Sequence, residues 1–369
     1  MLKILLCFGT RPEAIKMATL YHKLKDSNFE IKVCVTAQHR QMLDQVLNFF
    51  EIIPDYDLDL MQPSQSLNGL SAKILSKIDK VLLLEKPDLV LVHGDTTTSS
   101  MVALAAFHLG IKVGHIEAGL RTYNKQAPFP EEINRQITSR IVDIHFTPTK
   151  QATQNLLCEK ISRESIVQTG NTVIDALFWT ISKIQSANYK NEEIEQLKKI
   201  VSKGKKIILV TGHRRENYGE GIKNLCKALL KISERDDVTI IYPVHLNPNV
   251  KDIVHELLSN NKNVKLVEPL SYPAFVWLMQ QSFLVVTDSG GIQEETPSLG
   301  KPVLVTRNVS ERQEGVDAGF SILVGTNTTK IIEGIQNILN NFTGFKNKMS
   351  PYGNGDASKK IVDYLLKLY

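Results

Sequence analysis

The stretch Leu284-Val-Val-Thr-Asp-Ser-Gly-Gly-Ile-Gln-Glu-Glu-Thr-Pro-Ser-Leu-Gly300 contains the two kinds of element from which the fold can be predicted. Residues 284–287 are apolar or β-branched, which predicts a buried parallel strand. A polar turn with two glycines follows, and a helical pattern starts at Ile292. Glycine lets the backbone approach a ligand closely, and the free N–H groups at a helix N-terminus favour a phosphate. We therefore expect a strand–turn–helix unit with a phosphate site, where Glu294 or Glu295 of the first turn reaches a sugar hydroxyl.

The same turn would also serve as a plain helix cap, with glycines that only allow the chain to bend. A short glycine motif favours neither interpretation by itself. Evidence from the rest of the sequence is needed to choose between the phosphate site and the plain cap.

Strand and helix patterns alternate along the whole chain, which is typical of parallel α/β architecture. The strands are predicted at residues 4–8, 31–35, 89–92, 112–116, 144–147, 166–169, 206–210, 238–242, 264–267, 284–287 and 303–306. We expect two Rossmann-like domains, residues 1–170 and 171–350, with a C-terminal helix at 355–369 that packs back on the first. Ligands bind outside the carboxyl ends of parallel strands, so the predicted site is a central cleft that both domains face.

The composition is that of an ordinary soluble protein of 369 residues, with 42% hydrophobic and 22% charged residues. The net charge of +5 is small, and without a basic run it gives no indication of nucleic-acid binding. The four cysteines are dispersed, which favours reduced thiols over disulfides. The apolar run at residues 4–8 is too short for a signal peptide or a membrane span. We expect a cytoplasmic protein without membrane contact.

Carboxylates follow several predicted strands of the first half. Asp95 and Glu117 each come directly after a strand, and Glu131 and Glu132 open a helix after Pro130. Asp95 has an ordinary explanation as a helix cap, and Glu131 and Glu132 have one as first-turn residues that complement the helix dipole. Glu117 ends a β-rich run and has no such explanation. Together on one rim, with the cations Arg11 and Lys16 and the titratable His213, they predict a reaction centre.

His213 lies in the loop Gly-His-Arg-Arg-Glu after a strand of the second half. A single loop histidine is more often structural than catalytic, but three adjacent cationic or titratable residues favour contact with a diphosphate. The chain has no G-x-G-x-x-G fingerprint, no P-loop and no metal-spaced Cys/His set. We therefore predict neither a dinucleotide cofactor nor a metal.

Six ordered motifs span nearly the whole chain: Phe8-Gly-Thr-Arg-Pro-Glu-Ala-Ile-Lys-Met17, Val92-His-Gly-Asp-Thr-Thr-Thr98, His115-Ile-Glu-Ala-Gly-Leu-Arg-Thr122, Phe129-Pro-Glu-Glu-Ile-Asn-Arg135, Thr211-Gly-His-Arg-Arg-Glu-Asn217 and Thr287-Asp-Ser-Gly-Gly-Ile-Gln-Glu-Glu295. In these motifs the chain resembles the non-hydrolysing UDP-N-acetylglucosamine 2-epimerases. The resemblance implies the two-domain fold of many nucleotide-sugar glycosyltransferases (GT-B type). It also implies a homodimer, no cofactor and a role in bacterial surface-polysaccharide precursor synthesis.

Position by position, the resemblance implies roles for individual residues. Asp95, Glu117 and Glu131 match the acid/base carboxylates, and His213 matches a catalytic residue beside the diphosphate. The substrate-binding residues that it implies are Arg11, Lys16, Asp95, Glu117, His213, Leu270, Phe275, Ser289, Gly290, Gly291, Glu295 and Arg312. Among these, Ser289, Gly290 and Gly291 would hold the diphosphate, Glu295 the ribose, and Phe275 would lie near the uracil.

The sequence departs from the family pattern at two positions. Leu270 stands where some members have glutamine, so a contact with the base there would come from the backbone. Ser64 stands where some members have an arginine of a second, allosteric substrate site. Gln38, Gln41 and His245 do match that allosteric site.

The substrate limits the possible chemistry. No carbonyl lies next to C2 of an N-acetylhexosamine, so direct loss of the C2 proton is too difficult, and a route through NAD lacks its fingerprint here. In the other route UDP leaves C1 as the C2 proton is removed, and it adds again to the resulting glycal with protonation on the opposite face. This route needs a diphosphate clamp, carboxylates for proton transfer and protection from water.

Three alternatives remain open from the sequence. A hydrolysing relative would release N-acetylmannosamine and UDP, a glycosyltransferase of the same fold would transfer the sugar to an acceptor, and a catalytically silent sensor would only bind the nucleotide sugar. An assay with UDP-N-acetylglucosamine (UDP-GlcNAc) reduces this uncertainty most: the product is a sugar nucleotide or a free sugar, any turnover excludes the sensor, and a glycosyltransferase is detected by transfer to an acceptor.

Overall fold

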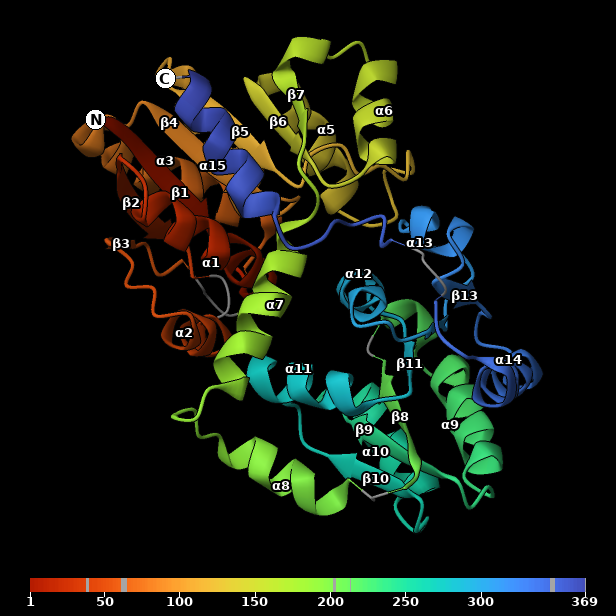
Figure 1. The fold of residues 1–369 in the computed structure, drawn as a ribbon. Coiled ribbons are helices and arrows are strands. Elements are labelled where there is room, and N and C mark those ends of the chain that lie inside the picture. Colours follow the sequence, from red (N-terminus) through yellow and green to blue (C-terminus); the bar gives the residue numbers. More distant parts are fainter. Residues whose placement is uncertain (38–39, 61–64, 202–203, 213, 346–348, 369) are drawn as a thin grey trace. The chain divides into compact units, whose positions relative to one another are not determined.

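The computed structural model describes residues 1–37, 40–60, 65–201, 204–212, 214–345 and 349–368. The chain divides into two compact units, Met1–Ala176 with Tyr352–Tyr369 (unit 1) and Leu177–Pro351 (unit 2). The division lies inside helix α7 (Thr172–Gln185), which runs from one unit into the other (Figure 1). Within the described ranges, no helix has the length and apolar character needed to cross a membrane.

Unit 1 has a parallel seven-stranded sheet in the order β3-β2-β1-β4-β5-β6-β7. The strands are β1 (Leu2–Phe8), β2 (Phe29–Val35), β3 (Tyr56–Asp57), β4 (Leu89–His93), β5 (Lys112–Ile116), β6 (Ile144–Thr147) and β7 (Ile166–Gln168). Its helices are α1 (Arg11–Lys25), α2 (Arg40–Phe49), α3 (Leu67–Glu85), α4 (Thr97–His108), α5 (Glu131–Ile141), α6 (Lys150–Cys158), the 3-10 turn η1 (Arg163–Ser165) and the C-terminal α15 (Ala357–Leu368). The strand order reverses between β1 and β4, so the loops after these two strands flank the switch point where such sheets bind ligands.

Unit 2 has a parallel six-stranded sheet in the order β10-β9-β8-β11-β12-β13. Its strands are β8 (Lys206–Thr211), β9 (Val238–Pro243), β10 (Val264–Val267), β11 (Leu284–Thr287), β12 (Val303–Val305) and β13 (Ser321–Leu323). The helices are α8 (Glu192–Ile200), α9 (Glu220–Ile232), α10 (Pro248–Leu258), α11 (Tyr272–Gln281), α12 (Gly290–Ser298), α13 (Gln313–Asp317) and α14 (Thr328–Asn341), with the 3-10 turn η2 (Arg215–Asn217). Here the order reverses between β8 and β11, whose following loops carry the His213 and Ser-Gly-Gly motifs. The predicted α/β class with two Rossmann-like domains is confirmed.

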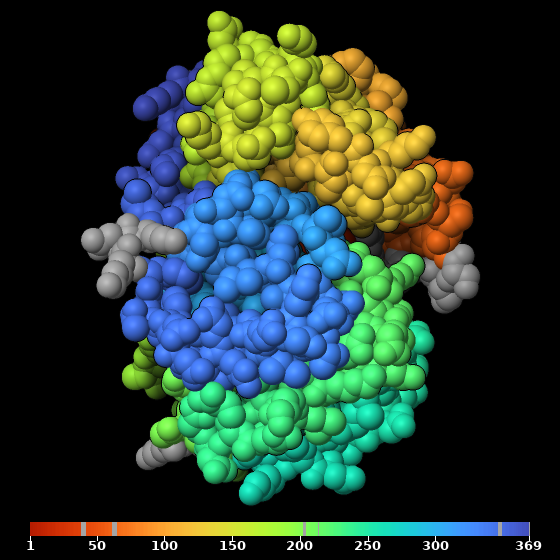
Figure 2. Space-filling model, turned by 90° about the vertical axis from the view of Figure 1, so that its right-hand side faces the viewer, coloured from red at the N-terminus to blue at the C-terminus, as the bar shows by residue number. Residues whose placement is uncertain are grey.

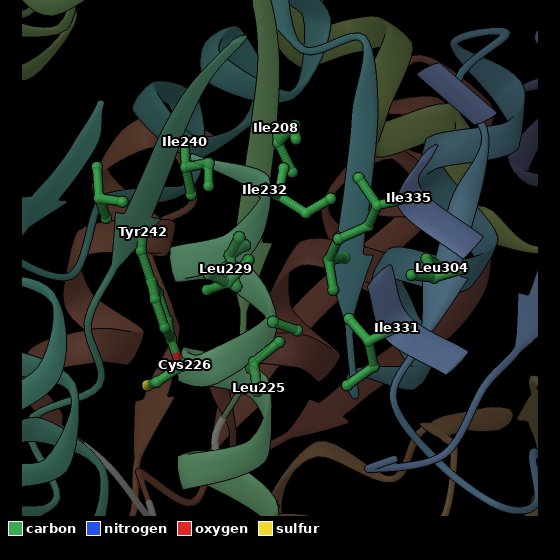
Figure 3. Close-up of a cluster of buried hydrophobic side chains, with 14 of the residues drawn as sticks. Ile208, Leu225, Cys226, Leu229, Ile232, Ile240, Tyr242, Leu304, Ile331 and Ile335 are labelled. Atoms are coloured by element: carbon green, nitrogen blue, oxygen red, sulfur yellow. The ribbon is translucent and has the colours of Figure 1, made fainter. Parts of the chain in front are cut away.

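The core of unit 2 is aliphatic and shows why its strands form. Side chains of β8, β9, β11 and β12 pack against Leu225 and Leu229 of α9 and against Ile331 and Ile335 of α14 (Figure 3). The helices α9 and α14 lie side by side and form adjoining green and blue parts of the surface in Figure 2. Because each helix presents one apolar face, α9 and α14 cover this face of the sheet and leave the carboxyl ends of the strands uncovered by these two helices.

The C-terminal helix α15 belongs to unit 1 and packs on α1 (Figure 1). The Asp175 carboxylate accepts hydrogen bonds from the N–H groups of Ala357 (3.1 Å) and Ser358 (2.8 Å), which start this helix. The Ser358 hydroxyl also bonds that of Thr19 in α1 at 3.0 Å. A carboxylate at a helix N-terminus satisfies otherwise unpaired donors, so the chain end is fixed to the unit that carries residues 1–176.

Candidate functional site

The loops after β1 and β4 are tied together by one buried carboxylate, that of Glu13. It accepts hydrogen bonds from the N–H groups of Gly9 (3.0 Å) and Thr10 (2.8 Å) and from the hydroxyls of Thr10 (2.8 Å) and Thr96 (2.7 Å). Burial raises the pKa of Glu13, and these donors oppose that rise. Glu13 and Thr10 form a capping box at the start of α1, and the bond from Thr96 joins this box to the loop after β4. Glu13 therefore fixes the switch point between β1 and β4.

Lys16 and Glu117, which are 101 residues apart, meet at this edge of the sheet. The Lys16 ammonium forms an ion pair with Glu117 Oε2, and the two side chains are 10% and 7% exposed. The Asn171 amide donates a second hydrogen bond to the same oxygen at 2.8 Å. Glu117 has a φ of 65°, a left-handed conformation that a non-glycine residue rarely adopts. Such strain is concentrated at functional sites, so the geometry supports the selection of Glu117 from the sequence.

Asp95 is held by helix α5. Its carboxylate pairs with Arg135 at 2.6 Å, and its carbonyl oxygen accepts a hydrogen bond from the Asn134 amide at 2.9 Å. The Asp95 side chain is a quarter exposed, whereas that of Arg135 is almost fully buried. The Phe129-Pro-Glu-Glu-Ile-Asn-Arg135 motif therefore orients Asp95 through Asn134 and Arg135, a function that its sequence does not reveal.

Glu132 orders the loop that precedes α5. Its fully buried carboxylate accepts hydrogen bonds from the N–H groups of Thr122 and Tyr123, both at 3.0 Å, and pairs with Arg135 at 3.1 Å. Burial alone would raise the pKa of Glu132, but these donors bring it below its usual value. The neighbouring Glu131 is the first residue of α5 and is half-buried. The helix pattern alone does not distinguish the two and the family resemblance implies a catalytic role for Glu131; the contacts of Glu132 show that it has a structural role.

The other site residues predicted in the first half of the chain are located as follows. Arg11 is the first residue of α1 and is half-buried. Gln38 and Ser64 lie outside the described residues. Gln41 lies in α2, but its side chain is not among those described.

In unit 2 the N-terminus of α12 is the feature best suited to an anion. The helix begins at Gly290, not at Ile292 as the sequence pattern suggested, because both glycines adopt helical backbone. Ser289 is the N-cap residue and makes no side-chain capping bond, so the first N–H groups point away from the helix without a cap from that side chain. A Cβ on Gly291 would meet no atom within 4 Å. This end of α12 therefore has the donors and the space that a phosphate needs.

The earlier helix start corrects the prediction for Glu294 and Glu295. Both lie in the second turn of α12, and both are buried. Glu294 pairs with Arg312 at 2.6 Å, and Glu295 accepts a hydrogen bond from the Tyr272 hydroxyl at 2.8 Å. The Arg312 guanidinium carbon lies 3.6 Å from the position of a Cβ on Gly290. Arg312 is thus fixed next to the N-terminus of α12, where its charge adds to that of the helix dipole.

The loop after β8 is anchored by Asp288. This fully buried carboxylate accepts hydrogen bonds from the Arg214 N–H (2.9 Å) and the Asn217 amide (3.1 Å). Burial would raise the pKa of Glu311, but Arg312 and Arg307 lower it to about 2. His213 itself lies outside the described residues. Arg307, in the loop after β12, pairs with Glu216 of η2 at 2.7 Å and with Glu311 at 2.6 Å, so polar and charged contacts join the loops after β8, β11 and β12.

Three further predicted residues surround this edge of unit 2. Leu270, in the loop before α11, and Phe275, in α11, are half-buried. His245 follows β9 and is exposed, and its Nδ1 accepts a hydrogen bond from the Asn247 N–H at 3.1 Å.

We predict that Gly291→Ala separates ligand binding from stability. The methyl group has free space and glycine is a poor helix residue, so the ligand-free protein should be unchanged or stabilised by up to about 1 kcal/mol. The same methyl group would occupy the space in front of the helix N-terminus, and UDP affinity should fall at least about tenfold, or 1.4 kcal/mol. Calorimetry with UDP and thermal unfolding without it measure the two effects. Unchanged UDP affinity would show that no phosphate binds at Gly291.

The sequence of this chain is similar to those of known proteins. A family model described as UDP-N-acetylglucosamine 2-epimerase matches residues 22–366. The protein of that name from Escherichia coli K12 is 51% identical over 99% of this chain and 98% of its own length. The one from Campylobacter jejuni is 52% identical over 99% of this chain and 97% of its own length.

Solved structures agree with these matches. A UDP-GlcNAc 2-epimerase from Neisseria meningitidis bound to UDP-GlcNAc is 50% identical, with a TM-score of 0.93 over 99% of this chain and 100% of that chain. The enzyme from Methanocaldococcus jannaschii, in complex with UDP-GlcNAc and UDP, is 35% identical, with a TM-score of 0.85 over 99% and 100%. A glycosyltransferase from Rickettsia africae, 17% identical with a TM-score of 0.58 over 98% of this chain and 93% of that chain, shares the fold.

Proposed function

Because the chain belongs to the UDP-N-acetylglucosamine 2-epimerase family, we propose that it interconverts UDP-GlcNAc and UDP-N-acetylmannosamine without releasing free sugar. The observation that carries this proposal is the ion pair of Lys16 with the strained Glu117 at the switch point of unit 1, beside Asp95. A carboxylate held in this way suits proton transfer, and the similarity to epimerases solved with UDP-GlcNAc supports the identity of the substrate.

The sugar is assigned to the residues of unit 1. One carboxylate among Asp95, Glu117 and Glu131 removes the C2 proton while the bond from C1 to the UDP oxygen breaks, which leaves a 2-acetamidoglucal and UDP. Another carboxylate then donates a proton to C2 from the opposite face as an oxygen of the β-phosphate of the same UDP adds again to C1. The atoms balance without any oxidation or reduction, and single variants of the three carboxylates distinguish their roles.

The diphosphate is assigned to the residues of unit 2. Negative charge develops on the leaving UDP, and preorganised donors that face this charge lower the barrier to C1–O cleavage. The N-terminus of α12, with Ser289, Gly290 and Gly291, and the guanidinium of Arg312 are such donors. We assign His213 to the same diphosphate, Glu295 to the ribose, and Phe275 with the backbone of Leu270 to the uracil.

From the family resemblance we further propose a homodimer, a cytoplasmic location and a product that supplies surface-polysaccharide synthesis. Gln38, Gln41 and His245 are proposed as part of a second site for activating substrate. Sedimentation of the purified protein should show a dimer at micromolar concentration, and a monomer at that concentration would remove this part of the proposal.

The product of the purified protein with UDP-GlcNAc alone tests the proposed function. Proton and phosphorus NMR should show a mixture of two sugar nucleotides that reaches the same ratio from either side. Accumulation of free N-acetylmannosamine with UDP would identify a hydrolase instead. No change without an added sugar acceptor, followed by transfer when one is supplied, would identify a glycosyltransferase.

A further inference from the structure

His93 differs from the other buried histidines of unit 1 in the hydrogen bonding of its ring. It is the last residue of β4 and only 3% exposed, and neither ring nitrogen has a hydrogen-bond partner within the described part of the chain. In contrast, the Nε2–H of His115 donates to the Gly94 carbonyl at 2.6 Å, and that of His145 donates to the Ser139 carbonyl at 3.0 Å. A buried polar group without a partner destabilises the fold, so its presence calls for an explanation.

The position of His93 links it to Glu117. The strands β4 and β5 pair in parallel with His93 opposite Ile116, and the Gly94 N–H donates to the Ile116 carbonyl at 2.9 Å. The backbone of Glu117 is left-handed. Its side chain lies close to Gly94, with Oε1 3.8 Å from the position that a Cβ on Gly94 would occupy. The carboxylate therefore lies over the residue that directly follows His93.

His93 also faces the helix that carries Lys16. Val90 and Val92 of β4 pack in the cluster formed with α3 and α4, and alternate residues of a strand point to opposite faces. His93 consequently lies on the other face, together with α1. The charged or titratable groups that act on it are Glu117, Lys16 and Asp95, with His115 on the neighbouring strand.

The imidazole is neutral in this environment. Burial lowers the pKa of His93 to about 4, and the opposing effect of Glu117 is smaller. A neutral ring carries one N–H donor and one acceptor nitrogen. It is able to donate a hydrogen bond to a carboxylate without adding a second positive charge to the site.

In the proposed reaction, a neutral hydrogen-bond donor would support the Glu117 carboxylate. Paired with the Lys16 ammonium, the Glu117 carboxylate is stabilised in its charged form and is a weak base. If the anionic substrate attracts Lys16, the buried Glu117 carboxylate loses its cationic partner, and a further donor would help to keep it ionised and in place.

We propose that His93 is a positioning residue for Glu117, and that its imidazole N–H donates to the Glu117 carboxylate when the substrate engages Lys16. This inference rests on the proposed roles of Lys16 and Glu117 in epimerisation. His93 acts through Glu117 and does not itself react with the sugar.

The direct test is NMR of the wild-type chain with ¹⁵N-labelled histidine, with and without saturating UDP-GlcNAc. The His93 signals are assigned from the spectrum of His93→Gln. We expect the ring to remain neutral and its N–H proton to move downfield when the ligand binds. A His93 signal that stays in place while other signals report binding would overturn the proposal, and this result does not depend on turnover.

Variants provide a second test, in which the measured quantity is the pH dependence of kcat. A purely structural role of His93 would not change this dependence. His93→Phe removes the donor, which should raise the pKa of Glu117 and shift the acidic limb of the kcat profile upward by about one pH unit, a tenfold loss on that limb. KM should change little, and His93→Gln, which keeps an N–H donor, should restore most of the profile.

The matched control is His145→Gln, at a histidine buried in the same sheet and bonded to a backbone carbonyl. It should lower the thermal stability without moving the acidic limb. If His93→Phe folds and keeps the wild-type profile, or if His93→Gln shifts it equally, the proposal is wrong. If His93→Phe does not fold, the NMR result decides. A wild-type chain that fails to epimerise in the same assay contradicts the proposed function, which separates the two failures.

Discussion

Replacing Glu117 with glutamine is expected to lower kcat by at least about 10²-fold, the usual effect of a lost general acid or base. Glutamine has the shape of glutamate, and its side-chain oxygen is able to keep the Asn171 hydrogen bond, so the fold should persist. The change removes the group that takes up or supplies the C2 proton. Asp95→Asn and Glu131→Gln should each have an effect of the same order. Turnover is followed by NMR with UDP-GlcNAc, and UDP affinity, measured by calorimetry, should change much less.

A carboxylate of the same unit offers a matched control. Glu85 pairs with Lys3 at 3.1 Å, at the amino-terminal end of β1 and thus at the opposite edge of the sheet. Glu85→Gln should leave turnover close to that of the wild type. Near-normal turnover in the Asp95, Glu117 or Glu131 variant would remove that residue from proton transfer, and a large loss in the Glu85 variant would show that the assay reports stability.

Arg312→Met is expected to have the second large effect, on both stability and UDP binding. Arg312 and Glu294 form a buried pair whose side chains are 9% and 1% exposed. Removing one partner of such a pair leaves a buried charge and costs about 3–5 kcal/mol of unfolding free energy. The variant also loses the cation beside the N-terminus of α12, so UDP affinity should fall at least about tenfold, or 1.4 kcal/mol.

The double variant Arg312→Met with Glu294→Gln separates these two effects. It has no uncompensated buried charge, so most of the lost stability should return, whereas UDP affinity should stay low. Denaturant unfolding and calorimetry measure the two quantities. Recovery of UDP affinity together with stability would mean that Arg312 supports the fold and does not contact the diphosphate.

The sheets could be predicted from the sequence because each strand is a short apolar run followed by a polar turn. The exceptions are the edge strands β3 and β13, neither of which is a buried apolar run. The start of α12 was placed two residues late, because glycines carry no helical signal although their backbone permits it. These errors are local and leave the predicted architecture intact.

The candidate site was partly predictable for a different reason. Residues at the carboxyl ends of parallel strands share one edge of the sheet, and this rule alone predicts that Asp95 and Glu117 lie on the same rim. Which neighbour each carboxylate contacts was not predictable. The pairing of Glu117 with Lys16, the support of Asp95 by Arg135 and the burial of His93 all depend on how α1 and α5 pack on the sheet.

The central claim is that UDP leaves C1 and adds again while the C2 proton is exchanged, and isotopes test it most directly. UDP-GlcNAc labelled with ¹⁸O in the bridge between C1 and the β-phosphate is incubated with the protein in D₂O. We expect deuterium at C2 of the N-acetylmannosamine product and, more slowly, of the recovered substrate. We also expect ¹⁸O in non-bridging positions of the β-phosphate, as UDP turns before it adds again. Deuterium at C2 with all ¹⁸O still in the bridge would contradict elimination, and a product without deuterium would contradict proton transfer at C2 altogether.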